Sequence, residues 1–171
     1  MKTGVKWGLI LGASVVVWTL VIHGFGFYTT NLAAGQKADV IATILPIAAI
    51  LLALRERRHL AAGSLSIKES VVTALVVGVV SVPVTAGFLW WYHHYMNPRW
   101  LDLLVDYQRA KMTAAGAAAD EITRAEAQQR SSGTDAAQLT GALVGSILVS
   151  GVIGLIGGLL IRWRNGKARS A

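Results

Sequence analysis

The chain has 171 residues, of which 54% are hydrophobic and only 15% are charged, and its net charge is +7. A soluble domain carries about 25% charged residues, so this composition excludes an ordinary soluble protein. The absence of cysteine excludes disulfides, thiolate nucleophiles and cysteine metal sites.

Three long segments without Lys, Arg, Asp or Glu predict membrane-spanning helices: residues 7–27, 71–92 and 139–161. Each exceeds the roughly 18 residues needed to cross a hydrocarbon core. A fourth segment, 40–54, has only 15 uncharged residues and contains Pro46, which is short for a span.

The distribution of basic residues supports four spans. With four spans, ten basic residues share the side of both termini and six lie on the other side. Without the 40–54 segment the numbers become seven and nine, which contradicts the positive-inside rule. The ten are Lys2, Lys6, Arg55, Arg57, Arg58, Lys68, Arg162, Arg164, Lys167 and Arg169. We therefore predict that both termini are cytoplasmic, and that the positive charge reflects topology and attraction to anionic lipid rather than nucleic-acid binding.

In chain order, the first span is predicted at about residues 5–28 and a short outer loop at Asn31–Asp39. The second span follows at about 38–55 and the third at about 67–95. The sequence SIKE, Ser66 to Glu69, predicts a capping box at the start of the third span, in which the Ser66 hydroxyl accepts the Glu69 amide N–H and Glu69 reaches back.

A polar stretch predicts a helical hairpin outside the membrane at about residues 97–131. Asn97 suits the N-cap and Pro98 the first turn of its first helix. That helix carries a charged stripe of Arg99, Asp102, Asp106 and Arg109 opposite an apolar stripe of Leu101, Leu104, Val105 and Met112. The stripes predict a helix that lies on the lipid surface or on the bundle, with its charges in solvent. Gly116 is expected to end it, a weaker helix follows, and the fourth span occupies about 136–162.

Small residues mark the predicted helix-packing faces. Gly4, Gly8 and Gly12 recur every four residues in the first span, and Ala142, Ser146, Ser150, Gly154 and Gly158 do so in the last. Such stripes let helix backbones approach closely. The pattern leaves open whether each partner helix belongs to the same chain or to a second copy, so a homo-oligomer remains possible.

Aromatic side chains cluster where the third span is expected to leave the membrane. Trp90, Trp91, Tyr92, Tyr95 and Trp100 are predicted to be interfacial anchors, because their rings suit the acyl boundary and their polar atoms the headgroups. His93 and His94 are adjacent and point about 100° apart on a helix, so they do not chelate one ion together. A metal or proton site would need His23 as well, with Asp39 or Asp102.

Candidate catalytic groups are few. Asp102 and Asp106 share one helical face, as acid–base chemistry requires, but arginines at pairing distance favour a charged surface stripe. No acidic or basic residue falls near a predicted midplane, where ion-coupled transporters usually need one. We find no nucleotide-binding, hydrolase or zinc-protease motif, and we predict no catalytic residue and no cofactor.

The order of these features resembles the bacterial four-span membrane proteins of domain-of-unknown-function family 4199. The resemblance is carried by YHHYMNP (Tyr92–Pro98), by AAGAAADEI (Ala114–Ile122) and by GSLSIKES (Gly63–Ser70). It covers almost the whole chain, departs from the family pattern at Ile67 and at Ser70–Val71, and implies the topology. It implies no activity, because none is assigned to the family.

These observations predict one all-α integral membrane domain, residues 1–171, built as a four-helix transmembrane bundle with an extramembrane hairpin between spans 3 and 4. We expect a non-enzymatic protein of a bacterial cytoplasmic (inner) membrane that contacts the lipid bilayer and a membrane or periplasmic protein. The alternative is a small transporter or channel subunit, for which Ser81, Thr85, His23 and Ser150 would line one path. A third possibility, a metal-dependent enzyme, requires His23 to meet His93 or His94.

Overall fold

The computed structural model describes the backbone of residues 1–169 and the side chains up to Trp163. The regular elements of this part are helices. They are α1 (Lys2–Gly24), α2 (Leu32–Ala42), α3 (Ile44–Leu60), α4 (Ile67–Trp91), a π-helical turn (Tyr92–Met96), α5 (Trp100–Ala114), α6 (Ala119–Ser132) and α7 (Asp135–Arg169). Residues 1–169 contain no strand, so the predicted all-α class is confirmed. The side chains of Arg164, Lys167 and Arg169, which count toward the predicted basic side, lie outside the described part.

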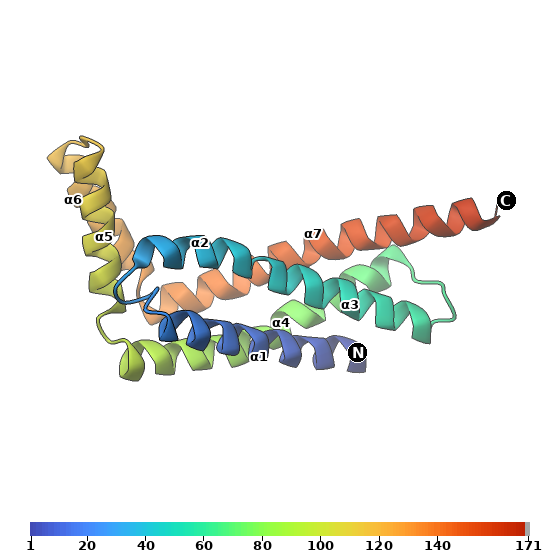
Figure 1. Ribbon diagram of the computed structural model, residues 1–171. Coiled ribbons are helices and arrows are strands. Elements are labelled where there is room, and N and C mark those ends of the chain that lie inside the picture. The colour runs from blue at the N-terminus through green and yellow to red at the C-terminus, as the bar shows by residue number, and fades with distance from the viewer. Residues whose placement is uncertain (170–171) are drawn as a thin grey trace.

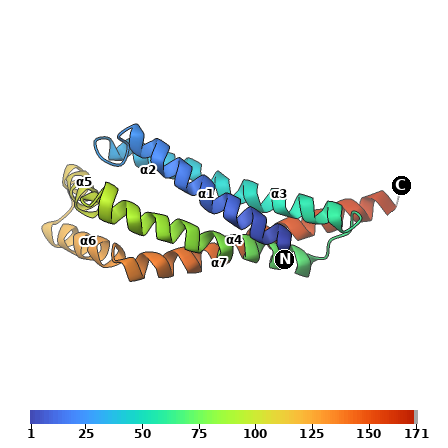
Figure 2. The same ribbon diagram turned by 90° about the horizontal axis from the view of Figure 1, so that it is seen from below.

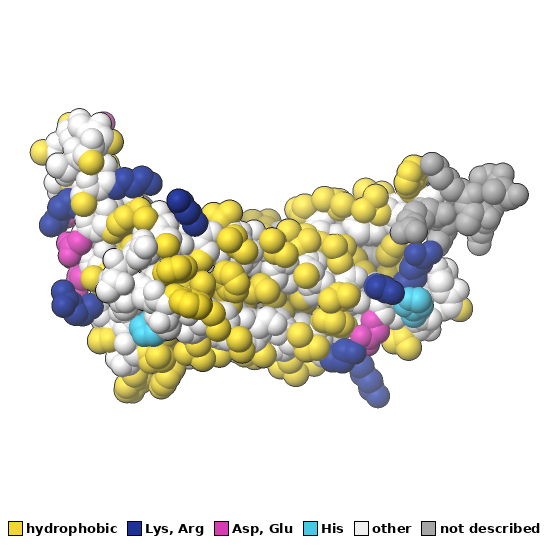
Figure 3. Space-filling view, viewed as in Figure 1, with side chains coloured by type: hydrophobic (Ala, Val, Ile, Leu, Met, Phe, Trp, Pro, Cys, Tyr) yellow, Lys and Arg dark blue, Asp and Glu magenta, His cyan; other side chains and the backbone are white. Residues whose placement is uncertain are grey.

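Within the described residues, four helical segments are long and apolar enough to cross a membrane: α1, α2 with α3, α4 and α7. They run along one axis, and the hairpin of α5 and α6 stands across one end of the bundle (Figures 1 and 2). We call this the hairpin end; the opposite, terminal end carries the N-terminus, the α3–α4 loop and the C-terminal part of α7 (Figure 1). Hydrophobic side chains cover the middle of the face in Figure 3, and charged side chains gather toward its two ends.

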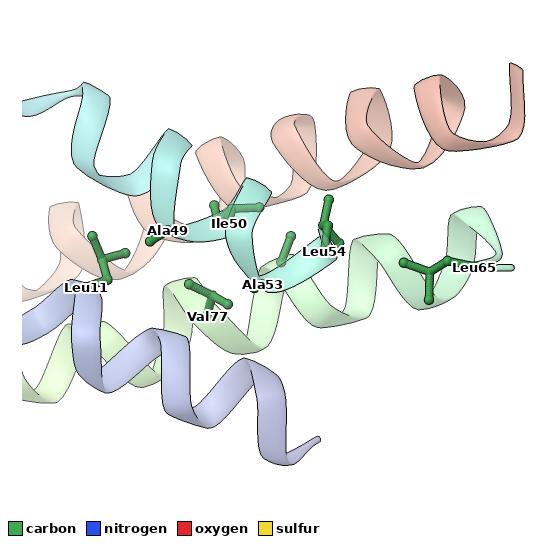
Figure 4. Close-up of a cluster of buried hydrophobic side chains, with 8 residues drawn as sticks. Leu11, Ala49, Ile50, Ala53, Leu54, Leu65 and Val77 are labelled. Carbon is green, nitrogen blue, oxygen red and sulfur yellow. The ribbon is translucent and has the colours of Figure 1, made fainter. Parts of the chain in front are cut away.

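Helix α4 forms the centre of the bundle, because it packs against α1, α3 and α7. The buried core between these helices consists of aliphatic and alanine side chains (Figure 4). Its fully buried members include Ile50 of α3 and Val77 of α4. Alanines at 53 and 74 are equally inaccessible, and their small size allows the helix backbones to approach closely.

The predicted outer loop at Asn31–Asp39 is wrong, because the chain is helical from Leu32. The Asn31 side chain accepts a hydrogen bond from the Ala34 amide at 3.1 Å and so caps α2. The helix ends at Ala42 because Pro46 has no N–H for the Ala42 carbonyl and its ring clashes there. A new helix, α3, starts at Ile44 with the proline in its first turn. The second span is therefore the pair α2–α3, which is longer than the predicted 38–55 segment.

Two of the three predicted helix boundaries are confirmed. Ser66 Oγ accepts the Glu69 amide at 3.1 Å and the Glu69 carboxylate accepts the Ser66 amide at 3.0 Å, which is the capping box. Gly116, with φ of +75°, lies just beyond the end of α5. Asn97 does not cap α5, since Arg99 occupies that position. The Asn97 side chain turns instead to the Tyr28 carbonyl at 3.1 Å.

Ion pairs hold the hairpin together. The Arg109 guanidinium binds the Glu126 carboxylate through two hydrogen bonds, of which the Nη2 bond is 2.8 Å. Arg130 of α6 donates to Asp102 of α5 at 3.0 Å. The predicted stripe on α5 is exposed as expected, but two of its four charges bind the other arm of the hairpin and are not simply solvated.

Candidate functional site

Three segments far apart in the sequence meet at the hairpin end: the α1–α2 loop, the π-helical turn and the start of α5. In the π-helical turn the Asn97 amide donates to the Tyr92 carbonyl at 2.8 Å, five residues back. This turn directs Tyr92 inward, where the residue is only 2% exposed, whereas Tyr95 is 66% exposed. The prediction that Tyr92 is an interfacial anchor is therefore wrong. Trp90, Trp91 and Tyr95 are exposed, and Trp100 is half-buried.

A polar network surrounds the Tyr92 hydroxyl. It shares a hydrogen bond of 2.7 Å with His23 Nδ1, and the Asn97 amide group approaches it at 3.5 Å. Asn97 also donates to the Tyr28 carbonyl. These contacts tie the end of α1 and the loop after it to the end of α4, so the network fixes the geometry of the hairpin end.

A cavity of about 360 Å³ opens beside this network. Its lining is formed by Val15, Trp18, Thr19, Phe27, Tyr28, Leu32, Gln36, Asp39, Ala42, Leu89, Tyr92, His93, Asn97, Trp100 and Leu104. Its volume falls within the ~300–1,000 Å³ range of small-molecule sites. Most of the lining is apolar, with a few polar groups from α1, α2 and the π-helical turn, which is the usual character of a ligand pocket.

Two residues that line the cavity have polar groups in unusual surroundings. The Tyr28 hydroxyl donates a hydrogen bond to the Asp39 carboxylate. Burial, and then this hydrogen bond, raise the pKa of Tyr28, so its hydroxyl stays protonated as a donor. The Trp18 indole Nε1 is buried and has no hydrogen-bond partner, which is uncommon for a buried polar group.

The histidines do not converge on one point. His93 stacks on Trp100 with ring centroids 4.0 Å apart. His94 Nδ1 donates to the Trp90 carbonyl at 2.8 Å, and its Nε2 lies 3.7 Å from Asp135. His23 is bonded to the Tyr92 hydroxyl, as described above. The described residues contain no group of three His, Cys, Asp or Glu that could hold a metal ion, so the geometry gives no support to the metal-dependent alternative.

The small-residue stripe of α1 faces α4. A Cβ atom added at Gly8 would lie 2.7 Å from Val80 Cβ and 2.8 Å from the Val77 carbonyl oxygen. Gly4 and Gly12 meet Val76 and Val84 in the same way. This face is therefore filled by α4 of the same chain.

The stripe of α7 also faces α4. The hydroxyls of Ser146 and Ser150 lie against Gly78, and Gly154 lies against Ala74. Gly158 continues the contact at Ser70. At the other end of the stripe, Ala142 lines a groove of about 820 Å³ between α4 and α7. Both stripes thus pack within the chain, and a second copy would have to use other surfaces.

The terminal end carries a basic groove between α3 and α7. The groove, about 700 Å³ in volume, is lined by Leu51, Leu54, Arg55, Arg58, His59, Gly63, Gly157, Leu160 and Ile161. Arg58 Nε donates to the Gly63 carbonyl at 3.0 Å. Arg55 is exposed and forms no ion pair with any described residue. Nearby, the Glu56 carboxylate accepts a hydrogen bond from Lys6 at 2.5 Å and another from the Trp7 indole N–H at 2.9 Å. These bonds join α1 to α3.

Comparison with known proteins identifies a family. A family model described as "Protein of unknown function (DUF4199)" matches residues 6–162. No curated protein and no solved structure matches the chain. The matched region reaches from α1 to α7, so it includes the cavity at the hairpin end and the groove at the terminal end.

Proposed function

The chain belongs to this family of proteins of unknown function, and on that premise we propose that it is a multi-pass protein of a bacterial cytoplasmic membrane that acts through lipid and protein contacts and not as an enzyme. The observation that carries the proposal is the segregation of apolar from charged side chains along the bundle axis. An apolar middle lies between two charged ends (Figure 3), and four helical segments are long and apolar enough to cross it. This is the pattern that a hydrocarbon core imposes.

We place the terminal end in the cytoplasm and the hairpin end outside, because the terminal end collects most of the basic residues. With the bundle axis along the membrane normal, the hairpin of α5 and α6 lies across the outer membrane surface. Its exposed ion pairs then face water, and its outer side offers a surface for a periplasmic or membrane protein.

Single cysteines test this orientation, since the chain has none of its own. Ala118, between α5 and α6, and Ser64, between α3 and α4, are both exposed. An impermeant thiol reagent should label Ala118→Cys in intact spheroplasts, and it should label Ser64→Cys only after lysis. The opposite labelling would overturn the orientation, and labelling of both before lysis would overturn the four-span topology.

The basic groove supports a lipid contact of defined chemistry. Arg55 and Arg58 suit an anionic headgroup, while Leu51, Leu54 and Leu160 suit an acyl chain. A basic residue near an anionic surface contributes about 1 kcal/mol, or roughly a fivefold preference. Native mass spectrometry of the protein with phosphatidylglycerol and phosphatidylcholine should show that preference fall about fivefold in Arg55→Gln. Lys68→Gln, at the same end but outside the groove, is the matched control; equal behaviour of the two variants would refute the contact.

The geometry gives less support to the transporter or channel alternative. Ser81 is buried and donates to the Gly78 carbonyl at 2.7 Å, and Ser150 is buried against the same glycine. Thr85 lines the separate groove between α4 and α7, and His23 is bonded to Tyr92. Ser150, Thr85 and, through Gly78, Ser81 thus belong to the contact between α4 and α7, whereas His23 lies at the hairpin end. Neither the cavity at the hairpin end nor the groove between α4 and α7 is lined by more than one of the four described side chains, which gives little support to a single polar path.

A further inference from the structure

The cavity at the hairpin end combines aromatic walls with one carboxylate. Five aromatic residues line it: Trp18, Phe27, Tyr28, Tyr92 and Trp100. They come from α1, from the α1–α2 loop, from the π-helical turn and from α5, so the tertiary fold is needed to bring them together. Asp39 of α2 is the only carboxylate in the lining, which includes no Lys or Arg among the described residues.

The charge of Asp39 is not balanced inside the protein. Its hydrogen-bond partner is the neutral Tyr28 hydroxyl, and it forms no ion pair with any residue up to Trp163. Lys37 lies two positions away on the same helix, a spacing at which side chains do not face each other. Asp39 is exposed, so a ligand in the cavity can reach its carboxylate, and an unpaired carboxylate attracts a cation.

Aromatic walls select the kind of cation. A small metal ion requires several oxygen or nitrogen ligands, and the described residues supply no such group. An ammonium group with carbon substituents is attracted to the faces of Trp and Tyr rings, and aromatic cages are the usual recognition sites for quaternary ammonium compounds.

We propose that this cavity binds an organic ammonium compound, with Asp39 as the counter-ion and the aromatic residues as the cage. Two sources supply this chemistry. One is a free amine from outside the membrane, and the other is the choline or ethanolamine headgroup of a lipid. The second source rests on the function proposed above, because only in a membrane does the cavity lie at headgroup level.

Choline is the probe for the first test, with the purified protein in an uncharged maltoside detergent. Its uncharged isostere, 3,3-dimethyl-1-butanol, has nearly the same shape and the same hydroxyl group. Because Trp18 and Trp100 line the cavity, binding is followed by tryptophan fluorescence. We expect choline to bind at least about tenfold more tightly than the isostere, since only choline offers a cation to the rings and the carboxylate. No saturable choline binding, or equal binding of the two compounds, would overturn the proposal.

A charge-removing variant tests the role of Asp39. Asp39→Asn keeps an oxygen acceptor for the Tyr28 hydroxyl, so the local fold is expected to survive. It should weaken choline binding about tenfold or more and leave binding of the isostere unchanged. Asp106→Asn removes a carboxylate at the same end that does not line the cavity, and it should leave choline binding unchanged. Equal loss in both variants would refute the assignment, and thermal unfolding of each verifies the fold. If Asp39→Asn does not fold, the comparison of choline with its isostere still tests the proposal.

Nanodiscs separate the two sources of ligand. Choline is titrated into protein held in phosphatidylglycerol bilayers, with and without phosphatidylcholine. Weaker choline binding in the presence of phosphatidylcholine identifies the lipid headgroup as the occupant, and unchanged binding identifies a free amine. If choline binds in neither bilayer, the proposal is overturned. The cysteine-labelling test above does not depend on any of these outcomes. The proposed orientation and the proposed ligand are therefore tested independently.

Discussion

The contact between α4 and α7 is expected to tolerate no added methyl group at Gly154. A Cβ atom there would lie 2.7 Å from Ala74 Cβ, 2.9 Å from Val71 Cα and 3.2 Å from the Ser70 carbonyl oxygen. Two carbon atoms pack at about 3.5 Å or more. Since 3.5 minus 2.7 is 0.8, Gly154→Ala must separate the helices by roughly 0.8 Å.

The same helix contains a matched control. A Cβ atom added at Gly145 meets nothing within 4 Å, so Gly145→Ala should gain about 1 kcal/mol of helix propensity with no packing cost. Gly154→Ala gains the same propensity. A gap of roughly 0.5–1 Å removes a quarter to a half of each dispersion contact, and overpacking costs typically about 1–3 kcal/mol. Taking about 2 kcal/mol for that cost, the free energies of unfolding of the two variants should differ by about 2 kcal/mol.

Thermal unfolding in detergent, followed by circular dichroism at the helix band, measures this difference. At about 2–4 °C per kcal/mol for a chain of this size, Gly154→Ala should melt roughly 4–8 °C below Gly145→Ala. If both variants shift the melting temperature equally, the close approach of α4 and α7 at Gly154 is not what stabilises the bundle, and the reasoning fails.

Three further changes test other parts of the structure. The hydrogen bond from Arg109 lowers the pKa of Glu126, so this pair stabilises the hairpin above the usual carboxyl pKa and the stabilisation is lost as the pH falls through the lowered value. Spin-label distances between α5 and α6 should therefore broaden in acid, and in Glu126→Gln they should be broad already at neutral pH. Tyr92→Phe removes the hydrogen bond to the half-buried His23 Nδ1 and should cost about 1–3 kcal/mol, whereas Tyr95→Phe, at an exposed site, should change the melting temperature little. Ser66→Ala removes the side-chain half of the capping box and should cost about 0.5–2 kcal/mol in the same assay.

The long apolar helices could be predicted from the sequence because the width of a hydrocarbon core acts on each segment separately. The wrong prediction of a loop at residues 31–39 arises from the same treatment of each segment on its own. The charges of Lys37 and Asp39 favour a loop before the uncharged segment 40–54, although Asn31 caps a helix that contains both. A rule based on uncharged segments cannot detect that the Asp39 carboxylate has a partner in Tyr28.

The cavity could not be predicted, because it depends on contacts between distant residues. The aromatic cluster was visible in the sequence, but local spacing does not tell which ring turns inward. That is decided at the π-helical turn, which Asn97 holds through the Tyr28 carbonyl, 69 residues away. The small-residue stripes show a related limit: a spacing of four identifies a contact face of a helix but not the helix that covers it. The partner, α4, became known only from the structure.

The central place of α4 has a consequence for biosynthesis. Ribosomes make α1, α2 and α3 before α4, yet the glycine face of α1 is complementary to the valines of α4. Until the third span has been translated, that face has no partner within the nascent chain. The order of translation thus differs from the order of assembly, because α1 completes its packing only after α4 has been made.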